Sequence, residues 1–263
     1  MQFIDTHTHL YLPEFDNDRD NVINRAIKNG VTKLLLPNID SVSIDPMMNL
    51  HRKYPGICYP MIGLHPTSVR EDHSEQMKLI RSQTDRNQFV AIGEIGIDLY
   101  WDKTYVKEQI TIFKEQVNLA IQHNLPIVIH SRDSFDEIFR ALDDFSNNPP
   151  AGVFHAFTGT YEQARKAIDM GFLLGVGGIV TFKNAGIDRV IEQTGADRII
   201  LETDSPYLAP TPNRGKRNES SYLILIAERV ATITGKSIEE IADITTSNAM
   251  NLFSLDKNID NEH

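Results

Sequence analysis

The sequence predicts an α/β protein with a (β/α)₈ barrel, a single domain with an extra helix near its C-terminal end. Short apolar segments alternate with amphipathic segments along the chain, and eight of the apolar segments can be counted. These segments are almost continuously apolar, as in parallel strands that are buried on both faces. Eight such units in 263 residues fit a closed barrel. An open doubly wound sheet is the alternative fold.

The first half of the chain is expected to contain four units of strand and helix. In the first helix, Val22, Ile23 and Ala26 lie on one face, and Gly30 provides a C-terminal stop. The expected strands are residues 3–4, 33–37, 57–62 and 89–92, and the helices that follow them are residues 16–30, 43–54, 74–84 and 105–123.

The second half repeats this pattern and ends with two consecutive helices. The expected strands are residues 125–129, 152–154, 172–175 and 198–201, and the helices between them are residues 134–145, 161–170 and 184–193. Residues 220–234 and 237–252 then form two helices, of which one closes the barrel and the other is extra. Ser237 and Glu240 have the spacing of a capping box. We expect a barrel domain over residues 1–255 and a polar tail over residues 256–263.

The composition is that of an ordinary soluble globular protein, with 41% hydrophobic and 24% charged residues. No segment is apolar enough to span a membrane, and residues 1–10 lack the features of a secretory signal. Cys58 is the only cysteine, which favours a reducing, cytoplasmic setting. The formal net charge of −10 argues against general binding of polyanions, so any contact with phosphate must be local.

Imidazole and carboxylate groups are concentrated where the expected strands end. His7 and His9 follow the first strand one residue apart, so both side chains face the same way. The other strand ends supply His65, Glu94, His130, His155 and Asp204. The carboxyl ends of barrel strands meet on one face, where active sites lie. Each histidine alone would more often be a hydrogen-bonded core or loop residue.

Taken together, these groups predict a metal site, because imidazole and carboxylate are common ligands of divalent metals. Even without His65, the four imidazoles and two carboxylates are too many for one tetrahedral zinc ion but suit two divalent ions that share a bridging carboxylate. Zinc, manganese and magnesium are all open. His51, His73, His123 and His263 lie in expected helices, loops or the tail and are given no role.

Six motifs give the chain a resemblance to a known family. They are FIDTHTHL, GLHP, AIGEIGIDLYW, LPIVIHSRDS, FHAFTG and LETDSPYLAPTPNRGKRNES, and they occur in this order between Phe3 and about Leu252. The chain thereby resembles the TatD-type metal-dependent deoxyribonucleases, TIM-barrel enzymes of the amidohydrolase superfamily. The resemblance implies that one metal is held by His7, His9, Glu94 and Asp204, and the second by Glu94, His130 and His155.

The resemblance also implies roles in catalysis. Glu94 would bridge the two ions, Asp204 would be the general base toward the attacking water, and His65 would contact the scissile phosphate. Several positions depart from the usual family pattern and put the substrate contacts in doubt. Thr67 and Asn213 stand where histidine is frequent, Ala156 where cysteine is frequent, and Ser220 where proline is usual.

Two arginines are candidate phosphate contacts. Arg217 lies in the loop of residues 212–218, the main concentration of positive charge in this acidic chain. Its guanidinium is suited to a bidentate phosphate contact, although it could instead pair with surface acids. Arg132 follows His130 closely and is the second candidate, with a structural ion pair as the alternative.

Other side chains near the strand ends have two interpretations each. Tyr100, Trp101 and Tyr207 follow the fourth and eighth strands, where they could stack on unpaired bases or simply pack. Asp98 could orient a metal-binding histidine or cap a turn.

The favoured function is therefore a cytoplasmic, metal-dependent hydrolase of phosphodiester bonds, an exonuclease on DNA ends or single strands. An alternative keeps the metals but acts on a small amide, ester or lactone, for which the charged loop around Arg217 would not be required. A noncatalytic metal-binding scaffold is a third hypothesis. DNA is the expected partner, with no membrane and no protein partner evident.

Overall fold

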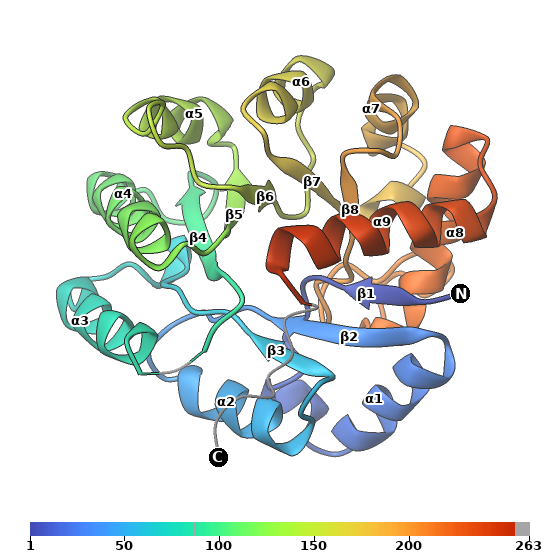
Figure 1. The fold of residues 1–263 in the computed structure, drawn as a ribbon, viewed down its shortest axis with the longest axis horizontal. Coiled ribbons are helices and arrows are strands. Elements are labelled where there is room, and N and C mark those ends of the chain that lie inside the picture. The colour runs from blue at the N-terminus through green and yellow to red at the C-terminus, as the bar shows by residue number, and fades with distance from the viewer. Residues whose placement is uncertain (87, 256–263) are drawn as a thin grey trace.

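The computed structural model describes residues 1–86 and 88–255, which contain eight parallel strands arranged as a ring (Figure 1). The strands are β1 (Phe3–Asp5), β2 (Val31–Leu36), β3 (Cys58–Pro60), β4 (Ile92–Asp98), β5 (Ile127–Arg132), β6 (Gly152–Phe154), β7 (Leu173–Val176) and β8 (Ile199–Leu201). Hydrogen bonds join them in the orders β1-β2-β3 and β4-β5-β6-β7-β8. Parallel bridges at Ile62–Ile92 and Thr8–Ser205 connect these two groups at both edges. The predicted closed (β/α)₈ barrel is confirmed.

Helices follow the strands and surround the ring. They are α1 (Arg19–Lys28), α2 (Ile44–Lys53), α3 (His73–Thr84), α4 (Val106–His123), α5 (Phe135–Asp143), α6 (Tyr161–Asp169), α7 (Ile187–Thr194), α8 (Leu223–Thr234) and α9 (Ile238–Phe253). Short 3₁₀ helices occur at Pro13–Phe15, Pro66–Ser68, Gly178–Thr181 and Ser220–Tyr222, and the sequence pattern did not separate them from loops or longer helices. The capping box of Ser237 and Glu240 is present at the start of α9.

The fourth strand differs from its expected position. It was expected to end at residue 92, but β4 begins at Ile92 and continues to Asp98. Two glycines and two acidic residues made this segment resemble a loop, whereas pairing with β5 continues it as a strand, with Gly96 opposite His130. The register shifts between Ile92 and Ile95, which marks an irregularity of the bulge type. Glu94 therefore lies within the strand and not after it.

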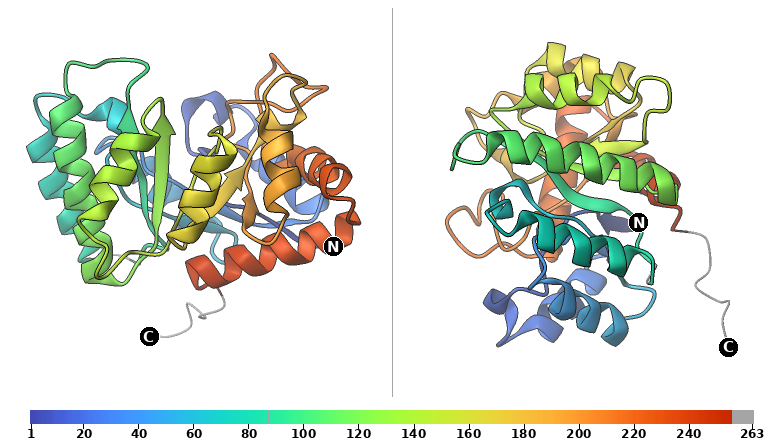
Figure 2. Two further views of the ribbon diagram at one scale, coloured as in Figure 1. Left: turned by 90° about the horizontal axis from the view of Figure 1, so that it is seen from above. Right: turned by 90° about the vertical axis from the view of Figure 1, so that its left-hand side faces the viewer.

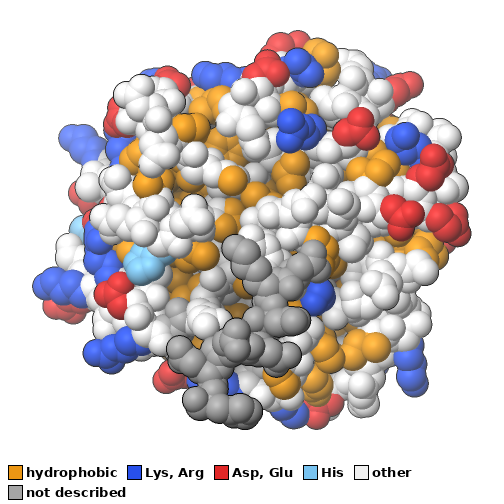
Figure 3. All heavy atoms as spheres, in the orientation of Figure 1, with side chains coloured by type: hydrophobic (Ala, Val, Ile, Leu, Met, Phe, Trp, Pro, Cys, Tyr) orange, Lys and Arg blue, Asp and Glu red, His pale blue; other side chains and the backbone are white. Residues whose placement is uncertain are grey.

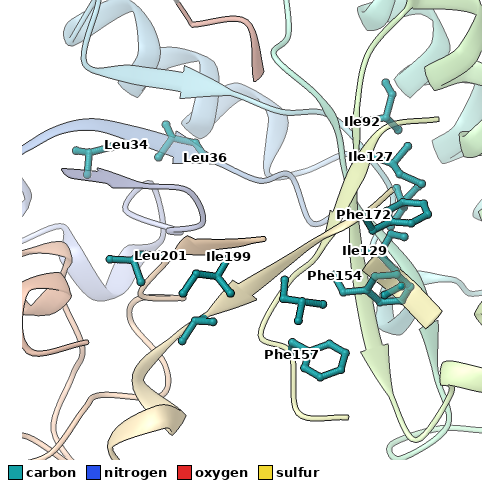
Figure 4. Close-up of a cluster of buried hydrophobic side chains, with 14 of the residues drawn as sticks. Leu34, Leu36, Ile92, Ile127, Ile129, Phe154, Phe157, Phe172, Ile199 and Leu201 are labelled. Carbon is teal, nitrogen blue, oxygen red and sulfur yellow. The ribbon is translucent and has the colours of Figure 1, made fainter. Parts of the chain in front are cut away.

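Strand side chains alternate between two cores. In β2, Leu34 and Leu36 belong to the cluster between the strands and the surrounding helices, whereas Leu35 belongs to the cluster inside the ring. Figure 4 shows the outer cluster, with Phe154 and Phe172 from neighbouring segments in contact. Their ring centroids lie 5.3 Å apart in an edge-to-face arrangement. This alternation is what the pleat of a strand requires when both faces are buried.

The extra helix α9 covers the end of the barrel at which the strands begin (Figure 2). Ala249 and Phe253 of α9 belong to the same cluster as Leu35 and the other side chains inside the ring. Thr246 also donates a hydrogen bond to the carbonyl oxygen of Gln2, just before β1. On this face, Lys and Arg side chains are interspersed with Asp and Glu (Figure 3). The extra helix therefore closes the end of the barrel at which the strands begin, and the end at which they finish stays open for a site.

Within the described part of the chain, no helix combines the length and the apolar character needed to cross a membrane. The tail expected over residues 256–263 lies outside the described residues.

Candidate metal centre

A cavity of about 760 Å³ opens at the carboxyl ends of the strands. Its lining includes His9, His65, Glu94, His130, His155 and Asp204, which come from the ends of strands far apart in the sequence. His7 is fully buried beneath them. The structure thus brings all seven predicted imidazole and carboxylate side chains into one site.

The first group of donor atoms surrounds one oxygen of Glu94. His7 Nε2 lies 3.0 Å from Glu94 Oε2, and His9 Nε2 lies 3.8 Å from the same oxygen. Asp204 Oδ1 lies 3.5 Å from His9 Nε2 and 3.8 Å from His7 Nε2. Tyr11 fixes the orientation of His9, because its hydroxyl lies 3.0 Å from His9 Nδ1 and donates to the carbonyl oxygen of Pro37. The Nε2 atom of His9 is thereby left free to bind a metal.

The second group surrounds the other oxygen of Glu94. His130 Nδ1 lies 3.0 Å from Glu94 Oε1, and His155 Nε2 lies 3.6 Å from it. His65 belongs to the same group, with its Nε2 atom 3.3 Å from both Glu94 Oε1 and His130 Nδ1. Thr67, one of the departures from the family pattern, holds His65 through a 2.6 Å contact between Thr67 Oγ1 and His65 Nδ1. The Nε2 atom of His65 therefore lies among the donor atoms of the second group, whereas the resemblance implied only a contact between His65 and the scissile phosphate.

The residues present fit a pair of divalent metal ions. Donor atoms that share a zinc ion at about 2.1 Å lie roughly 3.4 Å apart in tetrahedral geometry, and the donor atoms in each group have separations close to this value. Each oxygen of Glu94 faces its own group, which is the arrangement of a bridging carboxylate. His155 lies between the two groups, since its ring stacks on that of His7 at 3.5 Å and its Nε2 atom is 4.0 Å from Asp204 Oδ1.

The electrostatics keep both carboxylates ionised. Burial raises the pKa of Glu94, but the charges of His65, His7 and His155 and a hydrogen bond from His130 outweigh it and hold the pKa well below its ordinary value. Burial also raises the pKa of Asp204, and its hydrogen bond with His9 and the charges of neighbouring histidines lower it by more. Both side chains are therefore available as anionic ligands at neutral pH.

Two further carboxylates contact His130 and His155 at the ring nitrogens that do not face Glu94. Asp98 Oδ2 lies 2.9 Å from His130 Nε2, as the interpretation of Asp98 as an orienting residue expects. Glu202 Oε1 lies 2.9 Å from His155 Nδ1 and also accepts a hydrogen bond from the backbone N–H of Ala156. Glu202 was not predicted from the sequence, although its position directly after the eighth strand was a usable signal. Carboxylates behind metal-binding histidines fix the ring orientation and raise the basicity of the ligand.

Asp5 is a second supporting residue that was not predicted from the sequence. Its buried carboxylate accepts hydrogen bonds from the backbone N–H and the hydroxyl of Thr203, at 2.9 and 2.6 Å. Burial raises the pKa of Asp5 to about 7, against the opposing effect of these hydrogen bonds. Asp5 thus ties the end of β1, which His7 and His9 follow, to the segment that carries Asp204.

The two candidate phosphate-binding arginines have different environments. Arg132 lines the cavity and lies over the Tyr100 ring, 4.1 Å from its centroid. Among residues 1–86 and 88–255 no carboxylate pairs with it, so the alternative of a structural ion pair is not observed there. Arg217 lies outside the lining of the cavity. Its guanidinium pairs with the Asp18 carboxylate at 2.8 and 2.7 Å, and it also donates to the carbonyl oxygen of Glu14. Arg217 thus makes the pairing with surface acids that was its alternative interpretation, and its contact with phosphate stays a prediction.

Comparison with known proteins gives consistent matches over the whole domain. A family model described as "TatD related DNase" matches residues 4–254. The chain is 39% identical over 252 residues to an "Uncharacterized metal-dependent hydrolase YabD" of Bacillus subtilis, covering 95% of this chain and 98% of that protein. It is 31% identical to a "3'-5' ssDNA/RNA exonuclease TatD" of Pantoea ananatis, covering 95% and 99%. A crystal structure of the TatD homolog YjjV from Escherichia coli superposes with a TM-score of 0.90 at 28% identity, covering 96% and 98%.

Proposed function

The chain belongs to the TatD-related DNase family and is a metal-dependent hydrolase, and we propose that it hydrolyses the phosphodiester bonds of DNA as an exonuclease on ends or single strands. The observation that carries this proposal is the Glu94 carboxylate, whose two oxygens face separate groups of donor atoms. A site for two adjacent divalent ions suits a phosphodiester, because its negative charge is shared by two non-bridging oxygens that such ions can bind.

The proposed ligand sets follow from these two groups. His7, His9, Glu94 and Asp204 would hold one ion, and Glu94, His130 and His155 would hold the other, with His65 beside the second. The many imidazoles favour zinc or manganese, while magnesium is a less suitable ion for such ligands. When bound, such a pair of ions supplies Lewis-acid activation of water and neutralises charge on the phosphoryl oxygens.

The protein groups have separate tasks in this proposal. Asp204 acts as the general base and accepts the proton of the attacking water, because its carboxylate is held ionised and lines the cavity. His65 donates to a phosphoryl oxygen at the second group. The Arg132 guanidinium supplies a positive charge at the cavity wall that no carboxylate of residues 1–86 or 88–255 neutralises.

The class of polymer and the cellular setting are proposed on other grounds. Relatives such as the 31% identical protein of Pantoea ananatis are named as exonucleases of single-stranded DNA and RNA, which favours this polymer class for the present chain. We also propose a cytoplasmic setting, in which the buried thiol of Cys58 would stay reduced.

Cleavage of labelled DNA tests the proposal. Protein loaded with zinc, manganese or magnesium is incubated with a single-stranded oligonucleotide, and metal content is measured by elemental analysis. We expect two ions per chain and a ladder of shortened products. Asp204→Asn and Glu94→Gln should each reduce the cleavage rate at least about a hundredfold, the range expected for loss of acid–base or electrostatic catalysis.

His123→Asn is the matched control, because His123 pairs with Asp85 away from the site, and it should retain full activity. Absence of DNA cleavage with every metal would refute the proposal. Hydrolysis of an ester or lactone panel by the same preparation would then favour the alternative substrate class.

A further inference from the structure

Two large aromatic side chains lie exposed at the edge of the cavity. Tyr100 and Trp101, just after β4, are 52% and 69% exposed, and their rings meet edge to face with centroids 5.0 Å apart. Trp101 lines the same cavity as Asp98 and His130. Packing contributes little at such exposure, because most of the ring surface remains in water. Packing therefore does not account for the position of Trp101.

The main chain of this pair is held in place by Asp98, the carboxylate that also contacts His130. Asp98 Oδ1 accepts hydrogen bonds from the backbone N–H groups of Tyr100 and Trp101, at 2.9 and 3.0 Å. The other oxygen of the same carboxylate contacts His130 Nε2 at 2.9 Å. Only one carboxylate thus separates the exposed rings from a histidine of the second donor group. The rings are displayed at a fixed position relative to the proposed reaction centre.

Arg132 completes this surface. Its guanidinium carbon lies 4.1 Å from the centroid of the Tyr100 ring and 5.8 Å from that of the Trp101 ring. The guanidinium is not paired with a carboxylate in the part of the chain that the structure describes. Its charge therefore remains available to a phosphate, in a chain whose formal net charge is −10. We call Tyr100, Trp101 and Arg132 the aromatic platform.

We propose that Trp101, supported by Tyr100 and Arg132, stacks on the base of an unpaired nucleotide next to the scissile phosphate, so that the aromatic platform selects single strands over duplex DNA. This inference rests on the proposed function. A ring surface beside a positive charge is the combination that binds single strands, because each base has a flat face and each linkage has a charge. In a duplex, that face is covered by the neighbouring base pair, and it becomes available only when the base is unpaired and unstacked.

Tryptophan fluorescence tests the contact directly, because Trp101 is the only tryptophan of the chain. Metal-loaded protein is titrated with an oligothymidylate whose phosphorothioate linkages slow hydrolysis, with a strand of the same length and linkages that lacks bases, and with a duplex. We expect the oligothymidylate to quench the fluorescence and the strand without bases to leave it unchanged, with the duplex quenching far less than the single strand. Equal quenching by the strands with and without bases, or no quenching by either, would overturn the proposal.

Variants test what the contact contributes. Trp101→Ala should weaken binding of a labelled single strand by about 5- to 150-fold, the range for loss of one stacked base, whereas Trp101→Phe should retain most of the affinity. Tyr161→Ala is the matched control, because Tyr161 is also exposed but lies on α6, outside the lining of the cavity. An unchanged affinity for Trp101→Ala would contradict the proposal.

Cleavage by the unmodified protein separates the two proposals. Substrates with an ordinary phosphodiester backbone either carry all their bases or lack the bases beside the cleaved linkage. Preference for the complete strand, lost in Trp101→Ala, supports the platform. Cleavage of both substrates at the same rate rejects the platform and leaves the proposed function intact. Failure to cleave either substrate rejects the proposed function, and the fluorescence titration then decides on the stacking contact alone.

Discussion

Each of two histidines that face Glu94 has a second carboxylate behind it. Asp98 contacts His130, and Glu202 contacts His155. Glu202 sits tightly in place, because a Cβ atom at Gly175 would overlap its carboxylate. Without a bound ion, burial lowers the pKa of His155, but the charges of Glu202 and Glu94 outweigh burial and raise the pKa to about 10. The position of the second donor group therefore depends on residues that are not themselves proposed ligands.

Glu202→Gln is expected to weaken metal binding while the fold is retained. The amide keeps the shape of the side chain but loses the charge that orients and polarises His155, and loss of such a partner typically lowers metal affinity 10- to 100-fold. Competition with a metal-buffering chelator measures the affinity, and circular dichroism checks the fold. Glu115→Gln, which removes a partner of Arg81 on the surface, should bind metal as the unmodified protein does. Equal affinities in all three proteins would contradict the role of Glu202.

At the scale of elements, the sequence pattern predicted the order and type of all eight strands and all nine α helices of the described residues. The periodicity of apolar residues carries this information locally. The extension of β4 through Glu94 to Asp98 could not be predicted in this way, because it depends on pairing with β5.

The convergence of the seven imidazole and carboxylate residues was predictable from barrel geometry. The partner of Arg217 was not, because Asp18 is 199 positions away in the sequence.

The pairing of β4 with β5 leads to a prediction for Gly96. A Cβ atom at Gly96, where φ is +151°, would overlap the carbonyl oxygen of His130. Gly96→Ala should therefore push the two strands apart, lower the free energy of unfolding by about 3 kcal/mol or more, and weaken binding of the second ion. Urea unfolding and metal analysis measure the two effects.

Gly171→Ala is the matched control for this substitution. Gly171 also has a positive φ, +92°, but a Cβ atom there would meet nothing within 4 Å. Only the conformational cost should remain, about 1–2 kcal/mol, with metal binding unchanged. If the two variants lost the same stability and kept both ions, crowding between β4 and β5 would not be the reason for glycine at position 96.

At the scale of the whole molecule, the site and the extra helix occupy opposite ends of the barrel. Phe253 of α9 is 3% exposed and packs with the side chains that fill the ring. Phe253→Ala should lower the free energy of unfolding by about 3–5 kcal/mol, as for other buried Phe side chains. Asn251→Ala, on the exposed face of the same helix, should change it little. Urea unfolding gives the stabilities, and an equal loss in both variants would show that α9 does not close the core.

The beginning and the end of the barrel are also joined by an ion pair. Arg25 of α1 donates to both oxygens of Glu219, at 3.0 and 2.6 Å, and Ser221 donates to the same carboxylate. Burial raises the pKa of Glu219, but the hydrogen bonds from Arg25 and Ser221 outweigh it and lower the pKa below its ordinary value of 4.5. A carboxylate with a lowered pKa in the folded state stabilises the fold most when it is ionised.

Glu219→Gln should therefore destabilise the protein in a pH-dependent way. Above about pH 5, we expect a loss of about 1.5–3 kcal/mol, the range for hydrogen bonds to a charged group. This difference from the unmodified protein should shrink as the pH falls from 4.5 through the lower pKa of folded Glu219, because protonation removes the charge from both states of the unmodified protein. Urea unfolding of both proteins at pH 7, 5 and 3.5 measures it. Asp20→Asn, in an exposed pair with Lys53, should have a much smaller effect. If the loss of unfolding free energy in Glu219→Gln stayed constant down to pH 3.5, packing, and not the charge of Glu219, would join α1 to the segment before α8.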